Sequence, residues 1–312
     1  IRLGEYEGME EKLKEPKWKP DFGKSMINKR SGVTAIGARE FLIAYNINLN
    51  TSNKKLATDI ALDIREAGRA KRDPDNKIVR DNDGNIIKVP GKLKATKAVG
   101  WYIDEYKQAQ VSMNLINYNI TPIHIAFEAV RNEALKRGLR VTGSELVGLI
   151  PKKALIEAGD YYLKKQNQPQ GIPTSDKIQI AIQSLGLNDI SAFDPYNKII
   201  DFQVEAEFGE LSNLKIFEFM DELSRNCPAP GGGSVSALAG SLSAALNSMV
   251  SNLSINEDFE MMNQFSELSQ LLKNDLIKLI DEDTIAFNNI IEAIRLPKKT
   301  DQQKIRREKE IE

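Results

Sequence analysis

The sequence predicts an α+β fold, in which a split β-α-β, ferredoxin-like subdomain is followed by a truncated all-α helical-bundle domain. Three observations lead to this prediction. Apolar and polar residues alternate in several segments of the first half, which is typical of strands on a half-exposed sheet. Segments with helical spacing lie between these strands. After about residue 214, apolar residues recur at three- and four-residue steps, and no strand pattern returns.

The composition is that of a globular protein with two or more domains. The chain has 312 residues, of which 41% are hydrophobic and 28% are charged. Its 43 Lys and Arg residues balance 44 Asp and Glu residues, so no net charge favours nucleic acid or an acidic membrane. We see no signal peptide and no apolar run of about 20 residues. We therefore expect a cytoplasmic protein without nucleic-acid or membrane partners.

The single cysteine and the single histidine restrict the chemistry further. Cys227 has no partner for an internal disulfide, and one cysteine excludes an all-cysteine metal site. One histidine, His124, excludes a multi-histidine metal site, and we expect it to be a packed or surface residue. No metal is expected. The chain opens on Ile1 and closes on a charged helical pattern without a stop signal, so we expect an interior piece of a longer protein.

Residues 1–35 carry turn and loop chemistry ahead of the first strand. They include a loop of sequence GKSMINKRSG, whose members are Gly23, Lys24, Ser25, Met26, Ile27, Asn28, Lys29, Arg30, Ser31 and Gly32. Such a loop offers backbone N–H groups and cationic side chains to an anionic ligand. It lacks the spacing of a P-loop. A solvated connection without a ligand is the alternative interpretation.

The following 150 residues predict a sheet with helices on one face. The expected elements are a strand at 41–50, a helix at 54–66, a peripheral hairpin at 68–92, strands at 97–103 and 108–115, a helix from 122 to 136, a short strand at 140–142, and helices at 151–165 and 176–185. This order matches a split β-α-β sheet. The periodicity lapses from about 191 to 214, which we interpret as the end of the first domain and a linker.

One side of two neighbouring strands is rich in amides. Asn46, Asn48 and Asn50 follow one another on the first strand, and Gln108, Gln110, Ser112 and Asn114 follow on the third. In a split β-α-β sheet these sides share the open face. Amides on that face suit a heterocycle with donors and acceptors on both edges, or they simply face water.

The helical half contains a glycine-rich turn that starts a helix. After a short helix at 215–225, the turn residues Gly231, Gly232, Gly233 and Ser234 lead into a segment of Ala, Gly and Ser. Ser234 suits the N-cap position. Backbone N–H groups at such a helix start can bind an anion. A tight turn into a crowded bundle helix is an equal alternative.

A long amphipathic helix at 271–296 carries one carboxylate within its apolar stripe. Leu276, Leu279, Ile280 and Phe287 fall on one side of a helical wheel, and Asp283 falls among them. Asp281 and Glu282 are expected to point to solvent. A carboxylate buried among apolar residues is costly unless it is paired or its pKa rises, and a raised pKa suits a general acid or base. An ion pair, or a stripe open to solvent, is the alternative.

Two groups of motifs resemble known folate enzymes. FLIAYNINLN, KAVGWYIDEY, AQVSMNL and VTGSELVGLIP resemble the C-terminal subdomain of glutamate formimidoyltransferase. PAPGGGSVSALAGSLSAALNSMV, with LIDEDTIAF and RLPKKT, looks like the start of formimidoyltetrahydrofolate cyclodeaminase. Their fusion resembles the formimidoyltransferase-cyclodeaminase family of histidine degradation. The resemblance implies an end of the transferase N-terminal subdomain with a folate loop at 1–35, a transferase C-terminal subdomain at 36–207, a linker at 208–214 and the N-terminal part of a cyclodeaminase domain at 215–312.

The resemblance implies two reactions. The formimino group of formimidoylglutamate would move to the co-substrate tetrahydrofolate, expected in polyglutamylated form, and ring closure would then give 5,10-methenyltetrahydrofolate and ammonia. Asp283 matches the family's acid/base aspartate, and the loop 23–32 falls where the transferase binds folate. The turn at 231–234 is a further candidate for the folate or its glutamate tail. The family also implies a homo-oligomer, either a dimer or a ring of dimers.

The family's transferase histidine belongs to the N-terminal subdomain, and His124 does not match it. We therefore expect no formimino transfer by the 312-residue chain alone. Two other functions stay open. One is a methenyltetrahydrofolate cyclohydrolase, because the helical domain resembles those enzymes as well. The other is a non-catalytic folate-binding or assembly module.

Overall fold

The computed structural model describes residues 8–38, 40–204 and 209–311. The chain divides into two compact units, Ile1–Phe41 and Leu42–Glu312, which are described separately. The first unit contains a short helix, α1 (Met9–Lys12), and a single 3-10 turn, η1 (Pro16–Trp18). The ammonium group of Lys12 lies 4.9 Å from the centre of the Trp18 ring, which is a cation–π contact. The glycine-bracketed loop follows as irregular backbone.

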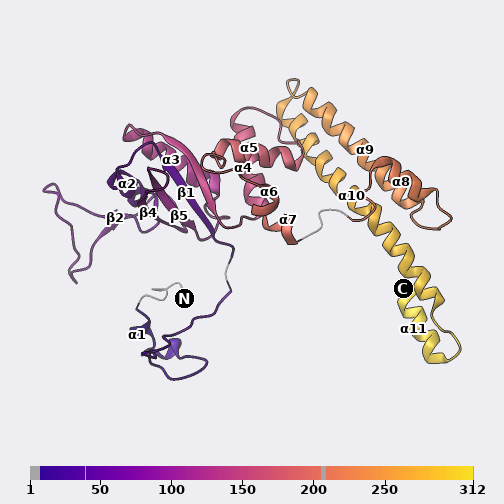
Figure 1. The fold of residues 1–312 in the computed structure, drawn as a ribbon, viewed down its shortest axis with the longest axis horizontal. Coiled ribbons are helices and arrows are strands. Elements are labelled where there is room, and N and C mark those ends of the chain that lie inside the picture. Colours follow the sequence, from indigo (N-terminus) through magenta and orange to yellow (C-terminus); the bar gives the residue numbers. More distant parts are fainter. Residues whose placement is uncertain (1–7, 39, 205–208, 312) are drawn as a thin grey trace. The chain divides into compact units, whose positions relative to one another are not determined.

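The second unit begins with a four-stranded antiparallel sheet (Figure 1). Its strands are β1 (Ile43–Leu49), β4 (Thr96–Ile103), β5 (Gln108–Leu115) and β6 (Val141–Val147), in the spatial order β4-β5-β1-β6. Strand β5 lies between β1 and β4, so the first strand-helix-strand unit is split by a third strand. Together with the helices, this sheet confirms the predicted α+β class. Strand β6 extends well beyond the expected residues 140–142.

The helices of this part lie close to the ranges that the sequence predicts. They are α2 (Lys54–Ile64), α3 (Ile123–Lys136), α4 (Lys152–Lys165) and α5 (Thr174–Leu185). The peripheral hairpin is formed by two short antiparallel strands, β2 (Arg69–Ala70) and β3 (Lys88–Val89). Two short helices, α6 (Pro195–Lys198) and α7 (Ile200–Val204), occupy the segment where we expected a linker.

The core forms on the side of β1 that alternation assigns to it. Ile43, Tyr45, Ile47 and Leu49 are all fully buried. Helices α2 and α3 pack against the sheet, with Ile60, Ile64 and Val130 among the buried residues of the same cluster. Helix α2 lies directly on β4 at Gly100, where a β-carbon would overlap the backbone of Thr58. Glycine at this strand position therefore permits the close helix–sheet contact.

An ion-pair network joins α2 to α3 at the edge of this core. Arg137 donates to the carboxylates of Asp59 and Glu133 over 2.6 Å and 2.8 Å, and it also pairs with Asp63. Burial opposes the charge of Glu133, but hydrogen bonds from Lys136, Lys92 and Arg137 outweigh it and lower the pKa of Glu133 to about 2. The network pairs the buried carboxylate of Glu133, as the burial of a charge requires.

Only helices follow residue 209 in the part of the chain that the structure describes. They are α8 (Ile216–Leu223), α9 (Gly232–Leu253), α10 (Phe259–Arg295) and α11 (Asp301–Ile311). Helix α10 starts twelve residues before the expected Leu271, because the Asp258 side chain accepts a hydrogen bond from the Met261 N–H and caps it there.

Helices α9 and α10 form an antiparallel hairpin (Figure 1). Contacts pair Ser234 with Asp283 at one end, and Ser248 with Gln270 nearer the turn. The loop between α4 and α5 contacts the hairpin near this turn. The carbonyl of Gly171 accepts hydrogen bonds from Ser248 Oγ (2.9 Å) and Asn252 Nδ2 (2.8 Å).

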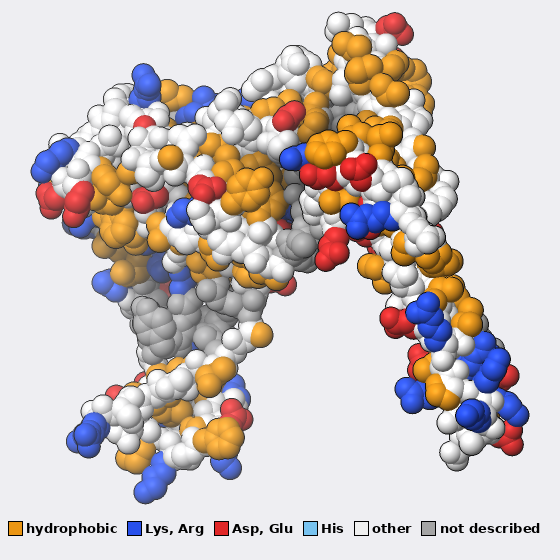
Figure 2. Space-filling view, turned by 45° about the vertical axis from the view of Figure 1, so that its right-hand side comes forward, with side chains coloured by type: hydrophobic (Ala, Val, Ile, Leu, Met, Phe, Trp, Pro, Cys, Tyr) orange, Lys and Arg blue, Asp and Glu red, His pale blue; other side chains and the backbone are white. Residues whose placement is uncertain are grey.

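Many apolar side chains of the hairpin stay exposed (Figure 2). They include Leu242, Leu246, Met249, Val250 and Leu253 on α9, and Leu268, Leu271, Leu272, Leu279, Phe287, Ile290 and Ile294 on α10. The described helices therefore cover only part of each other's apolar surface. None of the helices within the described ranges is long and apolar enough to cross a membrane.

Candidate active site

The carboxylate of Asp283 lies against the first turn of α9. Its Oδ2 accepts a hydrogen bond from the backbone N–H of Ser234 at 3.0 Å and lies 3.3 Å from the Ser234 hydroxyl. The first N–H groups of a helix have no partner within the helix, and the helix dipole favours negative charge there. Asp283 therefore caps α9 from the neighbouring helix. The glycine-rich turn and the predicted acid/base residue, 49 residues apart in sequence, meet at one place.

Glycine at position 233 permits this contact. A β-carbon on Gly233 would overlap both carboxylate oxygens of Asp283, whereas one on Gly232 would meet no atom within 4 Å. The helix starts at Gly232 with Gly231 as the N-cap residue. The expectation that Ser234 is the N-cap is therefore wrong, because Ser234 lies inside the first turn and is fully buried.

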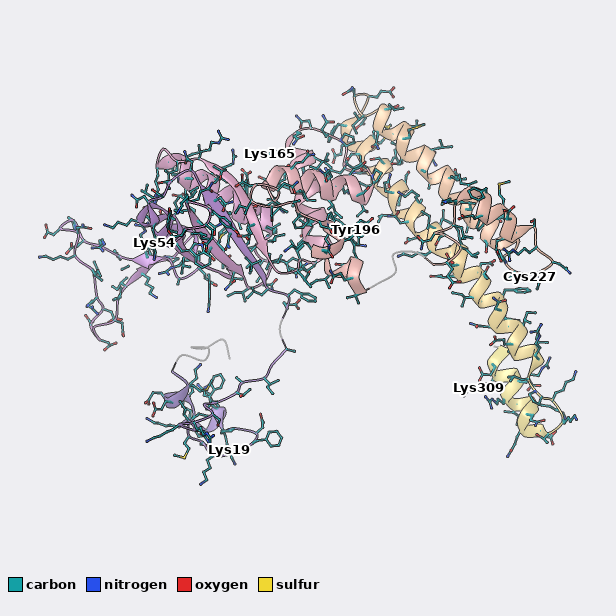
Figure 3. The ribbon with its side chains drawn as sticks, viewed as in Figure 1. Lys19, Lys54, Lys165, Tyr196, Cys227 and Lys309 are labelled. Atoms are coloured by element: carbon teal, nitrogen blue, oxygen red, sulfur yellow. The ribbon has the colours of Figure 1, made fainter. Side chains whose placement is uncertain are left out.

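A pocket of about 510 Å³ lies beside this contact. Its lining residues are Gly233, Ser236, Ala237, Leu276, Leu279, Glu282, Asp283 and Ala286. Two carboxylates, Glu282 and Asp283, thus share a mostly apolar wall with the start of α9. An apolar wall with a few convergent polar groups is the usual character of a small-molecule site. Cys227, in the turn before α9, is exposed (Figure 3).

The expectation that Asp283 is buried in an apolar stripe is wrong for the described residues. Asp283 is exposed, and so are Leu279 (45%) and Ile290 (45%) of the same stripe. The physical reason is that α9 begins opposite Asp283 and that α11 contacts α10 near Ile294, so the described helices leave these side chains uncovered. The alternative prediction, that the apolar stripe is open to solvent near Asp283, agrees with these exposures. What singles out Asp283 is its contact with α9 and not its burial.

The expectation for Asp281 is also wrong, because this residue does not point to solvent. It is 9% exposed, and its carboxylate accepts hydrogen bonds from Leu211 N (2.7 Å), Ser212 N (3.1 Å) and Ser212 Oγ (2.6 Å). A β-carbon on Gly209 would overlap this carboxylate. Residues two apart on a helix lie about 200° apart around its axis. Asp281 and Asp283 therefore fasten two different backbone segments to opposite sides of α10.

The loop 23–32 lies in the first compact unit, and all ten of its residues are exposed. Asn28 organises it, because its Oδ1 accepts hydrogen bonds from the backbone N–H groups of Arg30 (2.9 Å) and Ser31 (3.0 Å). Asn28 also forms an isolated bridge with Gly32. This turn leaves the side chains of Lys24, Lys29 and Arg30 at the surface, where they are available to an anion.

The amide-rich sides of β1 and β5 do share a face, because Asn48 pairs directly with Gln110. Asn48 and Gln110 do not face water, since both side chains are fully buried, whereas Asn50 and Asn114 are exposed. Gln110 Nε2 donates to Asn48 Oδ1 at 2.6 Å, and Gln110 Oε1 accepts from Trp101 Nε1 at 3.0 Å. Asn48 Nδ2 in turn donates to Asp189 Oδ2 at 3.0 Å. Trp101 and Asp189 join this network from other parts of the chain, and no periodicity in the sequence singles them out.

His124 is packed in the core, as expected. It is 7% exposed and its ring stacks on Tyr161 at 4.5 Å. Burial lowers the pKa of His124 to about 4, although the charge of Glu128 opposes this shift. Within the described residues its Nδ1 has no hydrogen-bond partner. A packed ring of this kind contributes to the core.

This pKa predicts a pH dependence of folding. A histidine whose folded pKa lies below its ordinary value of 6.5 contributes full stability above pH 6.5, and that contribution is lost as the pH falls towards about 4. We expect the ring protons of His124, the only histidine, to titrate near pH 4 in NMR spectra. A His124→Phe variant should lack this part of the stability change in urea unfolding. Titration near pH 6.5 would contradict the buried placement.

Within the described ranges, no group of three or more His, Cys, Asp or Glu side chains is placed to hold a metal ion. The site at Asp283 offers instead a carboxylate, a second carboxylate and a helix start. This set can move a proton and bind polar parts of a small molecule.

The fold and the site together define a class of α+β proteins with two parts. One part is an antiparallel sheet subdomain, and the other is a helical domain in which an aspartate caps a helix. Comparison with known families makes the class specific. The chain matches the formiminotransferase domain over residues 44–205, its N-terminal subdomain over 1–39, and the formiminotransferase-cyclodeaminase model over 215–312. The chain belongs to the formimidoyltransferase-cyclodeaminase family.

Several curated proteins are similar to the chain. Formimidoyltransferase-cyclodeaminase of Dictyostelium discoideum is 43% identical over 311 residues, which cover 96% of this chain and 54% of the relative. Glutamate formimidoyltransferase of Thermoplasma acidophilum is 41% identical over 54% of this chain and 48% of its own length. Methenyltetrahydrofolate cyclohydrolase of Methylorubrum extorquens is 37% identical over 32% of this chain and 50% of its own length. The chain thus spans about half the length of the bifunctional relative that it matches.

Proposed function

We propose that the intact protein is a bifunctional folate enzyme of histidine degradation. It transfers the formimino group of formimidoylglutamate to tetrahydrofolate and then converts the product to 5,10-methenyltetrahydrofolate and ammonia. The observation that supports the second reaction is the carboxylate of Asp283, which caps α9 and lies beside a pocket of about 510 Å³. The match to a relative whose name contains both activities supports their combination.

The second reaction is a proton-transfer problem. N10 of the folate attacks the formimino carbon, a new carbon–nitrogen bond forms, and the bond to the departing nitrogen breaks. The proton lost by N10 and the proton needed by the leaving amine both have to pass through a nearby group. In this proposal Asp283 accepts the first proton and supplies the second as ammonia leaves. The chemistry requires no metal, and none is proposed.

Folate contacts are assigned to two segments. The loop 23–32 presents Lys24, Lys29 and Arg30 at its surface, and these cations suit the carboxylates of a polyglutamylated tetrahydrofolate. At the helix start, the N–H of Ser234 is already occupied by Asp283, so Gly231 and Gly232 are the proposed tail contacts there. In this proposal Gly233 and Ser234 hold Asp283, and Gly233 also forms part of the pocket wall.

The architecture follows the same assignment. We assign residues 1–35 to the end of the transferase N-terminal subdomain, 36–207 to its ferredoxin-like C-terminal subdomain, 208–214 to a linker and 215–312 to the N-terminal part of the cyclodeaminase domain. The strand order β4-β5-β1-β6 supports the ferredoxin-like assignment. The exposed apolar side chains of α9 and α10 support a homo-oligomer, as a dimer or a ring of dimers. A cytoplasmic location is proposed from the single cysteine.

The test is to supply the purified intact protein with formimidoylglutamate and tetrahydrofolate. We expect release of glutamate, release of ammonia, and growth of the methenyl absorbance in equal amounts. A cyclohydrolase would instead consume added 5,10-methenyltetrahydrofolate without forming ammonia. A folate-binding module would bind tetrahydrofolate and release neither product. The family match over the sheet subdomain makes both alternatives less favourable.

A further inference from the structure

We infer that Ser234 is a positioning residue for Asp283: it fixes one carboxylate oxygen, so that the other oxygen carries the proton. This inference rests on the proposed deaminase function. It reassigns a residue of the glycine-rich turn from ligand binding to support of the acid/base group. Three observations lead to it, namely the one-sided hydrogen bonding of the carboxylate, the burial of Ser234, and the close approach of Gly233.

The carboxylate of Asp283 is held by one oxygen only. Oδ2 accepts from the Ser234 backbone N–H at 3.0 Å and lies 3.3 Å from Ser234 Oγ. Among the described residues, Oδ1 has no hydrogen-bond partner in the protein. Oδ1 lies against Gly233, which lines the pocket together with Asp283. Oδ1, which lies beside the pocket wall, is therefore the oxygen that can exchange a proton.

Ser234 is itself firmly placed. Its side chain is fully buried, and its Oγ lies 2.8 Å from the carbonyl of Ile280 and 3.1 Å from Thr284 Oγ1. A hydroxyl carries one hydrogen but accepts through two lone pairs. It can therefore donate to Oδ2 while the carboxylate is charged, and to the Ile280 carbonyl once Asp283 carries a proton. In either state the backbone N–H provides a second donor to Oδ2.

Few other charges surround the carboxylate. Of the residues that line the pocket, Glu282 is the other titratable group, and it comes from α10 as Asp283 does. The first two turns of α9, from Gly232 to Leu238, contain no charged residue. Asp281 lies on the far side of α10 and is paired with the segment at 211–212. The Ser234 hydroxyl is thus the nearest side-chain group that can respond to the charge of Asp283.

The experiment compares two buried serines of α9 in the intact protein. Ser234→Ala removes the hydroxyl beside Asp283, whereas Ser241→Ala removes a buried hydroxyl that donates to the Leu238 carbonyl at 2.9 Å, away from the pocket. We expect Ser234→Ala to lower kcat for ammonia release about 10-fold to 100-fold, as loss of fixed geometry does, with KM little changed. Ser241→Ala should change neither kcat nor KM.

Ser234→Cys provides a second variant if alanine prevents folding, because it fills the same space with a weaker donor. We expect its kcat to lie between those of the wild type and Ser234→Ala. An unchanged kcat in Ser234→Ala, a loss that appears in KM instead of kcat, or an equal loss of kcat in Ser241→Ala would overturn the inference. Failure of the proposed function looks different, since Asp283→Asn would then retain ammonia release. Loss of ammonia release in Asp283→Asn without an effect at Ser234 would overturn only the positioning role.

Discussion

Asparagine at position 283 is expected to lower ammonia release by the intact protein about 100-fold to 10,000-fold, the range that general acid–base groups contribute. The amide has nearly the shape of the carboxylate, and its oxygen can still accept the Ser234 N–H. The helix start should therefore stay capped and the pocket intact. What the variant loses is the ability to take up and return a proton.

Two measurements separate chemistry from structure in this variant. Formimino transfer should continue at the wild-type rate, so that the formimino intermediate accumulates in a stopped assay. Asp281→Asn serves as the matched control, because that carboxylate holds Leu211 and Ser212 and does not line the pocket. It should lower the free energy of unfolding by about 1–3 kcal/mol and leave ammonia release unchanged. Full deaminase activity in Asp283→Asn would contradict the acid/base assignment.

The elements of the sheet subdomain are visible in the sequence because burial there follows the period of each element. Ile43, Tyr45, Ile47 and Leu49 alternate in sequence and are all buried in the structure. The amides on the opposite side of β1 follow the same alternation. The burial of Asn48 does not follow from this alternation. It depends on Trp101 and Asp189, which reach the same face from other segments. A period reports which side a residue occupies, but not what covers that side.

The helical half shows the same limit more strongly. The helical wheel separates Asp281 from Asp283 correctly, since the two carboxylates do lie on opposite sides of α10. The wheel assigns Asp281 to solvent and Asp283 to the core, whereas Asp281 is the buried one. The reason is that each carboxylate is placed by a partner segment, 209–212 in one case and the start of α9 in the other. Apolar periodicity carries no information about such hydrogen bonds between helices.

Glycine would have been the better sequence signal for both contacts. Gly209 and Gly233 each lie where a β-carbon would overlap an aspartate carboxylate. Three glycines in a row before a helix predict an anion site, and an anionic side chain does bind there. The anion that the structure places there belongs to the protein itself.

The second large effect is expected for Gly233→Ala. The added methyl group would overlap both oxygens of Asp283, so the side chain has to leave the helix start. Displacement of a reacting group by about 1 Å costs on the order of 100-fold in rate, and we expect at least that loss in kcat for ammonia release. Alanine is otherwise a favourable residue inside a helix, so the fold should persist. Ammonia release and the thermal unfolding midpoint, measured together, check both parts.

Gly232→Ala is the matched control, one residue earlier in the same turn. Its methyl group would meet no atom within 4 Å, so Asp283 keeps its place and kcat should be retained. Because Gly232 is proposed to contact the glutamate tail, any loss in this variant should appear in KM, and it should grow with the number of glutamates on the substrate. Two alanine variants with equal kcat would show that the contact between Gly233 and Asp283 does not matter for the reaction. A loss of kcat confined to Gly233→Ala would instead trace the chemistry to the Asp283 carboxylate that this glycine leaves room for.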